Sequence, residues 1–195
     1  MAQRTWLVLT LALGGSSCRA SQADFRAPPV EVRSPSAYPE DFSWRQTVTV
    51  SYGEKASRTF DGVLEKVGDR LRLVGLTPVG TVIFVAEAEG SEVRFENRTG
   101  EALPFDGEHI LLDVQRVFFP WLEGPFADGQ RSGEVDGIEV RERVEDGGLV
   151  ERIFSDADGT LALVRFLEPG SPPPRSVLIG RRFGYQLDIE TLAGD

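Results

Sequence analysis

The 195-residue sequence is poor in the residues on which disulfide-rich proteins and many metalloenzymes depend, because it holds one cysteine and one histidine. A single cysteine excludes an internal disulfide framework, and a single histidine excludes a histidine-rich metal site. Lysine and arginine number 21 against 31 aspartates and glutamates, which gives a formal net charge of −10 at pH 7. Because binding to nucleic acid needs a basic surface that neutralises phosphates, we expect no nucleic-acid partner.

Complete motifs for catalysis are also missing. Residues 153–161 resemble the first motif of haloacid-dehalogenase phosphatases, in which a nucleophilic aspartate follows a buried strand. That chemistry needs a later lysine, and both lysines of the chain precede the motif. We therefore interpret Asp156 and Asp158 as an acidic hairpin turn. His109 has no Gly-x-Ser-x-Gly elbow to assist, so we predict a non-enzymatic protein with no cofactor and no metal.

The first 17 residues have the order of a bacterial export signal. Arg4 precedes an apolar run of eight residues, 6–13, and glycines and serines then lead to Cys18. The run is less than half of the about 20 residues that a transmembrane helix needs. We interpret residues 1–17 as a lipoprotein signal peptide and Cys18, which resembles the acylated cysteine of the bacterial lipobox, as the lipidation site. Ser21-Gln22-Ala23 offers a competing site for cleavage after Ala23, which would leave a soluble periplasmic or secreted protein.

Residues 18–41 contain four prolines with serine and alanine between them, which is typical of a tether. Arg19 after the cysteine resembles the sorting signal of outer-membrane lipoproteins in Gram-negative bacteria. The hydrophobic fraction of 41%, with 12 phenylalanines, is ample for a packed core. We therefore predict a single β domain over residues 42–195, anchored by a lipid to the periplasmic face of the outer membrane.

From residue 44 onward, apolar residues recur with a period of two, as Val48, Val50 and Tyr52 do. This alternation predicts antiparallel strands with one wet face. We expect about ten of them, near residues 44–52, 58–67, 70–75, 81–88, 92–96, 138–141, 149–155, 160–167, 175–180 and 185–190. The strands near 81–88 and 160–167 are apolar on nearly both faces, so we expect them at the centre of the sheet.

One segment has a helical period instead, with Ile110, Val114, Val117, Phe118 and Trp121 on one face. An aspartate at 106 can cap this helix and a proline at 120 can end it, which predicts a helix near 108–119. Residues 121–136 contain three glycines and a proline, and we interpret them as a long loop. The predicted fold class is mainly β (α+β), a curved antiparallel sheet that covers its apolar face with the helix or curls on itself.

Three stretches carry a resemblance to a known family. Residues 71–81 resemble a strand, turn and strand written Leu-Thr-x-Pro-Leu-Gly in LolB-like proteins, with Val79 in the place of the leucine. Residues 110–115 and the following Phe-Pro-Trp resemble an Ile-Leu-x-Asp-x-Gln helix with its terminal proline, and residues 184–189 resemble a closing strand. Together they resemble a domain-of-unknown-function family of proteobacterial outer-membrane lipoproteins, allied to the LolA/LolB lipoprotein carriers and often found near aryl polyene biosynthesis genes.

The resemblance implies a LolA/LolB-like half-barrel of strands with a helical lid over an apolar cavity. The candidates for lining this cavity are Ile83, Val85, Ile110, Val114, Val117, Phe118, Trp121, Phe166, Tyr185 and Leu187. The turn that holds Val79 is the candidate for facing the membrane.

The function implied is that of a monomeric, lipid-anchored carrier that binds or transfers a lipid, another acyl-bearing small molecule or a lipoprotein in the periplasm. The alternative is a structural or assembly lipoprotein whose core is solid and whose sheet binds a protein partner.

Overall fold

The computed structural model describes residues 31–53, 57–100, 103, 105–125, 127–168 and 170–192. The expected signal peptide, Cys18, the first part of the tether and residues 193–195 lie outside this range. Eleven strands form one antiparallel sheet in the order β5-β4-β3-β2-β1-β11-β10-β9-β8-β7-β6. The strands are β1 Phe42–Tyr52, β2 Arg58–Val67, β3 Arg70–Leu76, β4 Val82–Glu89, β5 Glu92–Asn97, β6 Gly129–Val135, β7 Ile138–Glu145, β8 Gly148–Asp156, β9 Gly159–Phe166, β10 Arg175–Gly180 and β11 Tyr185–Leu192.

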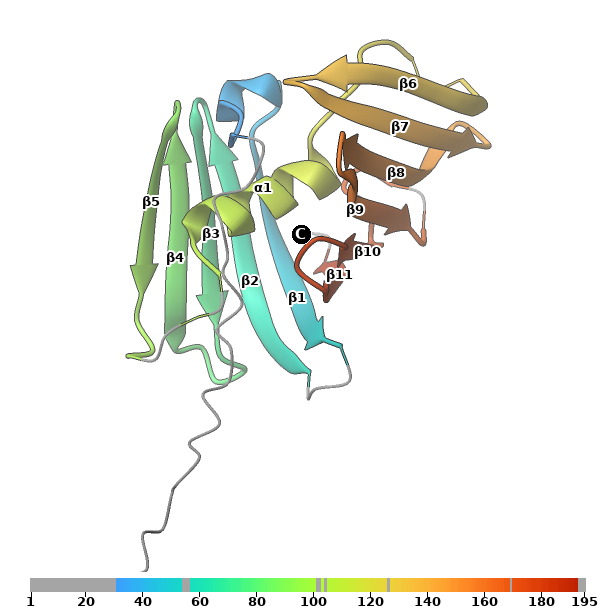
Figure 1. Ribbon diagram of the computed structural model, residues 1–195. Helices are drawn as coiled ribbons and strands as arrows, with labels where there is room; N and C mark the ends of the chain where they lie inside the picture. The colour runs from blue at the N-terminus through green and yellow to red at the C-terminus, as the bar shows by residue number, and fades with distance from the viewer. Residues whose placement is uncertain are drawn as a thin grey trace, which may run out of the picture.

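Two meanders make up this sheet, β1–β5 and β6–β11, and they meet where β1 pairs with β11. The chain passes from β5 at one edge to β6 at the other through the helix α1, Gly107–Phe118. Figure 1 shows the open sheet bending around α1, which lies on the concave face, called the inner face below. The predicted fold class, a curved antiparallel sheet with one helix, is confirmed.

The helix begins and ends where its sequence predicts. The backbone N–H of His109 donates to Asp106 Oδ1 at 3.0 Å, and the helix ends at Phe118, two residues before Pro120. Its first residue is a glycine for a steric reason, because a Cβ on Gly107 would lie 2.9 Å from the Cβ of Phe95 in β5. The helix N-terminus therefore packs directly on the sheet. Within the described residues, no helix is long and apolar enough to cross a membrane.

The prediction of a loop over residues 121–136 is wrong for its last part, because β6 occupies residues 129–135. This strand is at an edge of the sheet and is mostly exposed, so its sequence shows no apolar alternation. The pair Asp136-Gly137 does indicate a strand on each side of it, although the apolar pattern does not. Both have positive φ, 54° and 77°, in the two-residue turn that joins β6 to β7. Asp-Gly between two strands is typical of such a hairpin.

The prediction that the strands near 81–88 and 160–167 are central is also wrong. β4 is second from one edge and β9 is fourth from the other, whereas β1 and β11 lie at the middle of the order. The apolar character of β4 reflects coverage by other parts of the chain and not a central position, because Phe84, Ala86 and Ala88 are buried on a strand beside the edge.

Residues at the end of the expected tether pack against the domain. The backbone of Arg33 exchanges two hydrogen bonds with the buried amide of Gln115 in α1, at 2.8 and 2.6 Å. A short 3-10 helix, Pro35–Ala37, follows, and the ring of Tyr38 lies 5.3 Å from that of Phe119. Gln115 thus joins α1 to the segment that enters the sheet.

Candidate functional site

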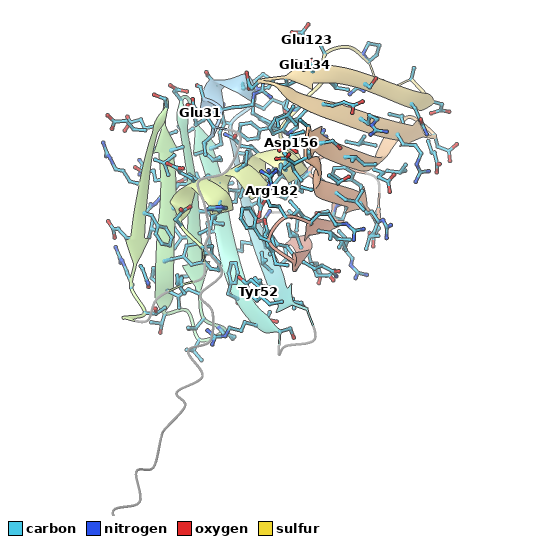
Figure 2. The ribbon with its side chains drawn as sticks, in the orientation of Figure 1. Glu31, Tyr52, Glu123, Glu134, Asp156 and Arg182 are labelled. Atoms are coloured by element: carbon cyan, nitrogen blue, oxygen red, sulfur yellow. The ribbon has the colours of Figure 1, made fainter. Side chains whose placement is uncertain are left out.

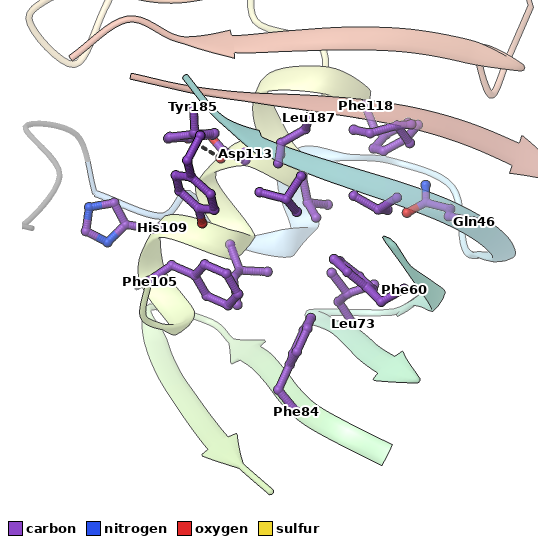
Figure 3. A pocket seen from close by; sticks show the side chains of 16 residues that line it. Gln46, Phe60, Leu73, Phe84, Phe105, His109, Asp113, Phe118, Tyr185 and Leu187 are labelled. Carbon is purple, nitrogen blue, oxygen red and sulfur yellow. Dashed lines mark hydrogen bonds between the residues drawn. The ribbon is translucent and has the colours of Figure 1, made fainter. Parts of the chain in front are cut away.

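An apolar pocket lies between α1 and the inner face of the sheet (Figure 3). Four strands next to one another, β4, β3, β2 and β1, form its floor together with β11, and α1 covers it. Its lining residues are Gln46, Val48, Val50, Tyr52, Phe60, Leu73, Phe84, Phe105, His109, Ile110, Asp113, Val114, Phe118, Tyr185, Leu187 and Ile189.

The pocket is small and partly open to solvent. The space that the centre of a water molecule can occupy is about 70 Å³, and the empty space between the lining atoms, mouth included, is about 690 Å³. Because one water needs about 10–15 Å³ by the first measure, the inner part has room for roughly five to seven groups of that size. A methylene group is of similar size, so the inner part fits a short stretch of hydrocarbon chain.

Five of the ten residues expected from the sequence line the pocket. They are Ile110, Val114, Phe118, Tyr185 and Leu187. The other five lie elsewhere. Ile83 and Val85 flank Phe84, which lines the pocket, and neighbouring residues of a strand point to opposite faces.

The remaining three residues are buried in other contacts. Trp121 packs edge-on against Phe154, with ring centroids 4.8 Å apart, and its Nε1–H donates to the carbonyl of Gln115 at 2.8 Å. The guanidinium of Arg152 lies 5.7 Å from the ring centroid of Phe166. Val117 is buried and does not line the pocket. Val79 is 87% exposed in the turn between β3 and β4.

A buried group of polar side chains occupies one side of the pocket. The hydroxyl of Tyr185 donates to Asp113 Oδ2, and Arg116 Nη1 donates to Asp113 Oδ1 at 3.0 Å. Burial raises the pKa of the Asp113 carboxyl, and the charge of Arg116 opposes this shift. His109 Nδ1 lies 2.7 Å from Asp106 Oδ1. The carboxylate of Asp113 therefore joins α1 to β11 at the pocket wall. This contact explains why the helical motif contains an aspartate and why the closing strand contains Tyr185.

A second buried ionic group holds the other end of the helix. Glu142 in β7 is fully buried between Arg131 in β6 and Arg152 in β8. Arg152 Nε donates to Glu142 Oε1 at 2.6 Å, and Arg131 Nε donates to Glu142 Oε2 at 2.7 Å. Arg152 Nη1 also donates to the carbonyl of Arg116 at 2.7 Å. The last turn of α1 is thereby joined to β8.

The acidic motif at residues 156–158 is a hairpin turn, as predicted. It joins β8 to β9, which are antiparallel, and the backbone N–H of Asp158 donates to Asp156 Oδ1 at 2.9 Å. Arg182 Nη2 donates to Asp156 Oδ2 at 2.8 Å, and both residues are labelled in Figure 2. Within the part of the chain that the structure describes, no three histidine, cysteine or acidic side chains come together as metal ligands would.

The three tyrosines are expected to ionise at higher pH in the folded protein than in the unfolded chain. Burial raises the pKa of Tyr52 to about 12 and raises the pKa of Tyr38 and Tyr185 above 10.0 as well. The unfolded chain then loses tyrosine protons that the folded chain keeps, so the free energy of unfolding falls as pH rises from about 10 to about 12. Tyrosinate absorbance measured against pH, with and without guanidinium, checks this. A tyrosine that ionises near pH 10 in the folded protein would contradict it.

Comparison with known proteins gives one family match and distant structural similarities. A family model described as a protein of unknown function (DUF3261) matches residues 43–193. A LolA superfamily protein from Nitrosomonas europaea is 9% identical, with a TM-score of 0.44 over 83% of this chain and 87% of that one. A domain from Vibrio parahaemolyticus, provisionally described as an outer membrane lipoprotein-sorting protein domain, is 11% identical, with a TM-score of 0.41 over 81% and 86%.

A DUF1329 family protein from Desulfovibrio piger is 14% identical, with a TM-score of 0.35 over 78% of this chain and 83% of that one. No curated protein is similar enough to the chain to count as a relative. All three structural similarities are distant ones.

Proposed function

We propose that this chain, which belongs to the DUF3261 family of proteins of unknown function, binds or transfers a lipid or another acyl-bearing molecule without catalysing its conversion. The observation that carries the proposal is the pocket between α1 and the inner face of the sheet. Its lining is aliphatic or aromatic apart from Gln46, His109 and Asp113. Apolar pockets with a few placed polar groups are the usual binding sites of small hydrophobic molecules.

The size of the pocket sets the expected contribution to binding. Roughly five methylene groups in its inner part would contribute about 4 kcal/mol at about 0.8 kcal/mol each. The rest of a longer chain would lie in the mouth, where burial is partial. An empty apolar space of this kind does not need to hold water, because water gains few hydrogen bonds there.

Titration of the purified chain with a fluorescent dodecanoyl methyl ester tests the proposal. We expect saturable binding, and we expect an unlabelled ester to displace the fluorescent one. A denatured sample of the same chain is the control for nonspecific partition. A folded chain that shows no saturable binding would contradict the proposal and favour the assembly protein with a solid core.

The anchor is a further part of the proposal. The unique cysteine follows the apolar run and the glycine–serine stretch, as the acylated cysteine of a lipoprotein would. Lipid chains on Cys18 would hold the protein on the periplasmic face of the outer membrane, where we propose that it acts as a monomer. The exposed turn with Val79 is then the part of the described domain that we propose touches the bilayer.

Replacing Cys18 by serine is expected to abolish labelling of the protein with radioactive palmitate and to release it from the membrane fraction, because no other cysteine can take the lipid. Labelling and fractionation of cells that express each form measure both effects. Ser17→Ala is the matched control, since it leaves the thiol in place. Palmitate on the Cys18→Ser protein would contradict the proposed anchor.

A further inference from the structure

One polar side chain in the pocket, that of Gln46, has a buried amide nitrogen that is not used in a hydrogen bond to the described residues. Gln46 lies on β1 in the inner row that also holds Val48 and Val50, and it is 3% exposed. Among the described residues, no atom is placed to accept a hydrogen bond from its Nε2. Buried amides nearly always have partners, because an unsatisfied donor costs free energy. A buried donor without a partner that faces a ligand pocket is therefore a candidate contact for a ligand.

The surroundings of Gln46 are suited to a polar group on an otherwise apolar ligand. Gln46 is opposite Thr191 of β11 in the register of the sheet, and Thr191 Oγ1 is also buried without a hydrogen-bond partner among the described residues. Figure 3 shows Gln46 at one end of the pocket and His109 and Tyr185 at the other, with apolar side chains between them. A ligand that reaches Gln46 would thus present an acceptor at one end of a hydrocarbon stretch.

The charge of the lining decides which acceptor is suitable. None of the sixteen described lining residues is lysine or arginine, and the lining includes the carboxyl group of Asp113. An ionised carboxylate taken into such a site loses its water without gaining a cation, which is costly. A neutral ester or amide carbonyl loses much less on leaving water and regains one hydrogen bond from the amide N–H.

We infer that the pocket selects acyl chains whose head is a neutral ester or amide, and that Gln46 Nε2 donates to the carbonyl oxygen of that head; this inference rests on the proposed lipid-binding function. Gln46 is then the residue that determines specificity, and the apolar lining supplies affinity. A plain hydrocarbon would leave the Gln46 donor buried and unpaired, and it would therefore bind more weakly than an ester of equal length.

Competition binding on the purified chain tests the inference with four ligands of nearly equal length: methyl dodecanoate, N-methyl dodecanamide, dodecanoate and tridecane. Each ligand is added in increasing concentration to compete with the fluorescent ester for the protein. We expect the ester and the amide to bind about tenfold more tightly than tridecane, which corresponds to one net hydrogen bond. We expect dodecanoate at neutral pH to bind more weakly than the ester.

The variant Gln46→Met keeps the side-chain volume and removes the donor. We expect it to remove the preference for the ester over tridecane, so that the ratio falls to about one. Gln186→Met is the matched control, because Gln186 is exposed on the same sheet and does not line the pocket. It should keep the wild-type ratio. The carbonyl stretching frequency of a ¹³C-labelled ester gives a second readout, and we expect a shift to lower frequency in the wild-type complex that Gln46→Met abolishes.

The outcomes separate this inference from the function on which it rests. Wild-type protein that binds no ligand would overturn both. Tridecane that binds as tightly as the ester, or dodecanoate that binds more tightly, would overturn the inference and leave lipid binding intact. An ester preference and a carbonyl shift that persist in Gln46→Met would show that Gln46 is not the donor, and would overturn the inference in the same way.

Discussion

Replacing Glu142 by glutamine is expected to lower the free energy of unfolding by about 3–5 kcal/mol, which for a chain of this size corresponds to a fall in Tm of roughly 6–20 °C. The carboxylate is fully buried, and it accepts hydrogen bonds from Arg152 at 2.6 Å and from Arg131 at 2.7 Å. Glutamine has nearly the same shape but no charge, so the buried guanidinium of Arg152 would lose its counter-ion. The cost arises from that uncompensated charge and not from a cavity.

Thermal unfolding followed by circular dichroism measures this effect, with Glu139→Gln as the matched control. Glu139 is on the same strand and pairs with Arg141 at 3.3 Å, but both side chains are more than half exposed. Exposed ion pairs contribute little, so we expect the control to change the free energy of unfolding by less than about 1 kcal/mol. Equal changes in Tm for the two variants would contradict the assigned role of Glu142.

Replacing Val48 by phenylalanine is expected to weaken binding of the fluorescent dodecanoyl ester by roughly 100- to 1,000-fold, because the larger side chain fills the space of most of the five methylene groups and removes about 3–4 kcal/mol. Val48 is buried on β1, between Phe60 of β2 and Ile189 of β11 in the register, and it lines the pocket. Filling an empty apolar space commonly keeps or raises stability, so Tm should not fall much.

The matched control is Val177→Phe on β10. Val177 does not line the pocket, and it belongs to the outer row of a strand whose inner row is Ser176, Leu178 and Gly180. We expect this variant to bind the ester as the wild type does. Val50→Phe gives an independent test in case Val48→Phe fails to fold, since Val50 lines the same pocket. Binding of wild-type strength by folded Val48→Phe and Val50→Phe would place the ligand outside the pocket.

Glu142 and Val48 lie on different parts of the same inner face. The charges around Glu142 secure the last turn of α1 through the bond from Arg152 to the carbonyl of Arg116. The pocket lies toward the other meander, under the same helix. Loss of stability in Glu142→Gln and loss of binding in Val48→Phe are therefore expected to occur separately, which a protein with a single solid core would not show.

Local pattern in the sequence was sufficient for most of the elements. The alternation of Val48, Val50 and Tyr52 predicts β1, and the capping aspartate at 106 with the proline at 120 predicts the limits of α1, because both signals involve residues close together in the chain. β6 was missed because an exposed edge strand has no apolar row, although its Asp-Gly turn was a usable signal.

The pocket was only partly predictable for a physical reason. An apolar period states which face of a strand or helix is covered, but not which other element covers it. Phe84 lines the pocket and its neighbour Ile83 does not, because adjacent residues of β4 point to opposite faces. Trp121 was expected on the apolar face of the helix, but it lies beyond the end of α1 at Phe118, and its ring packs against Phe154 of β8.

Composition and local period alone therefore determined an acidic, mainly β domain with one helix and no site rich in cysteine or histidine. Only the tertiary structure decided that Asp113 meets Tyr185, that Glu142 is buried, and that Gln46 faces an apolar pocket with no hydrogen-bond partner for its Nε2 among the described residues. Each of these facts depends on contacts between strands and a helix that are distant in sequence, above all on the pairing of β1 with β11. Such long-range pairing is set by the packing of the whole sheet around α1, which no short stretch of sequence specifies.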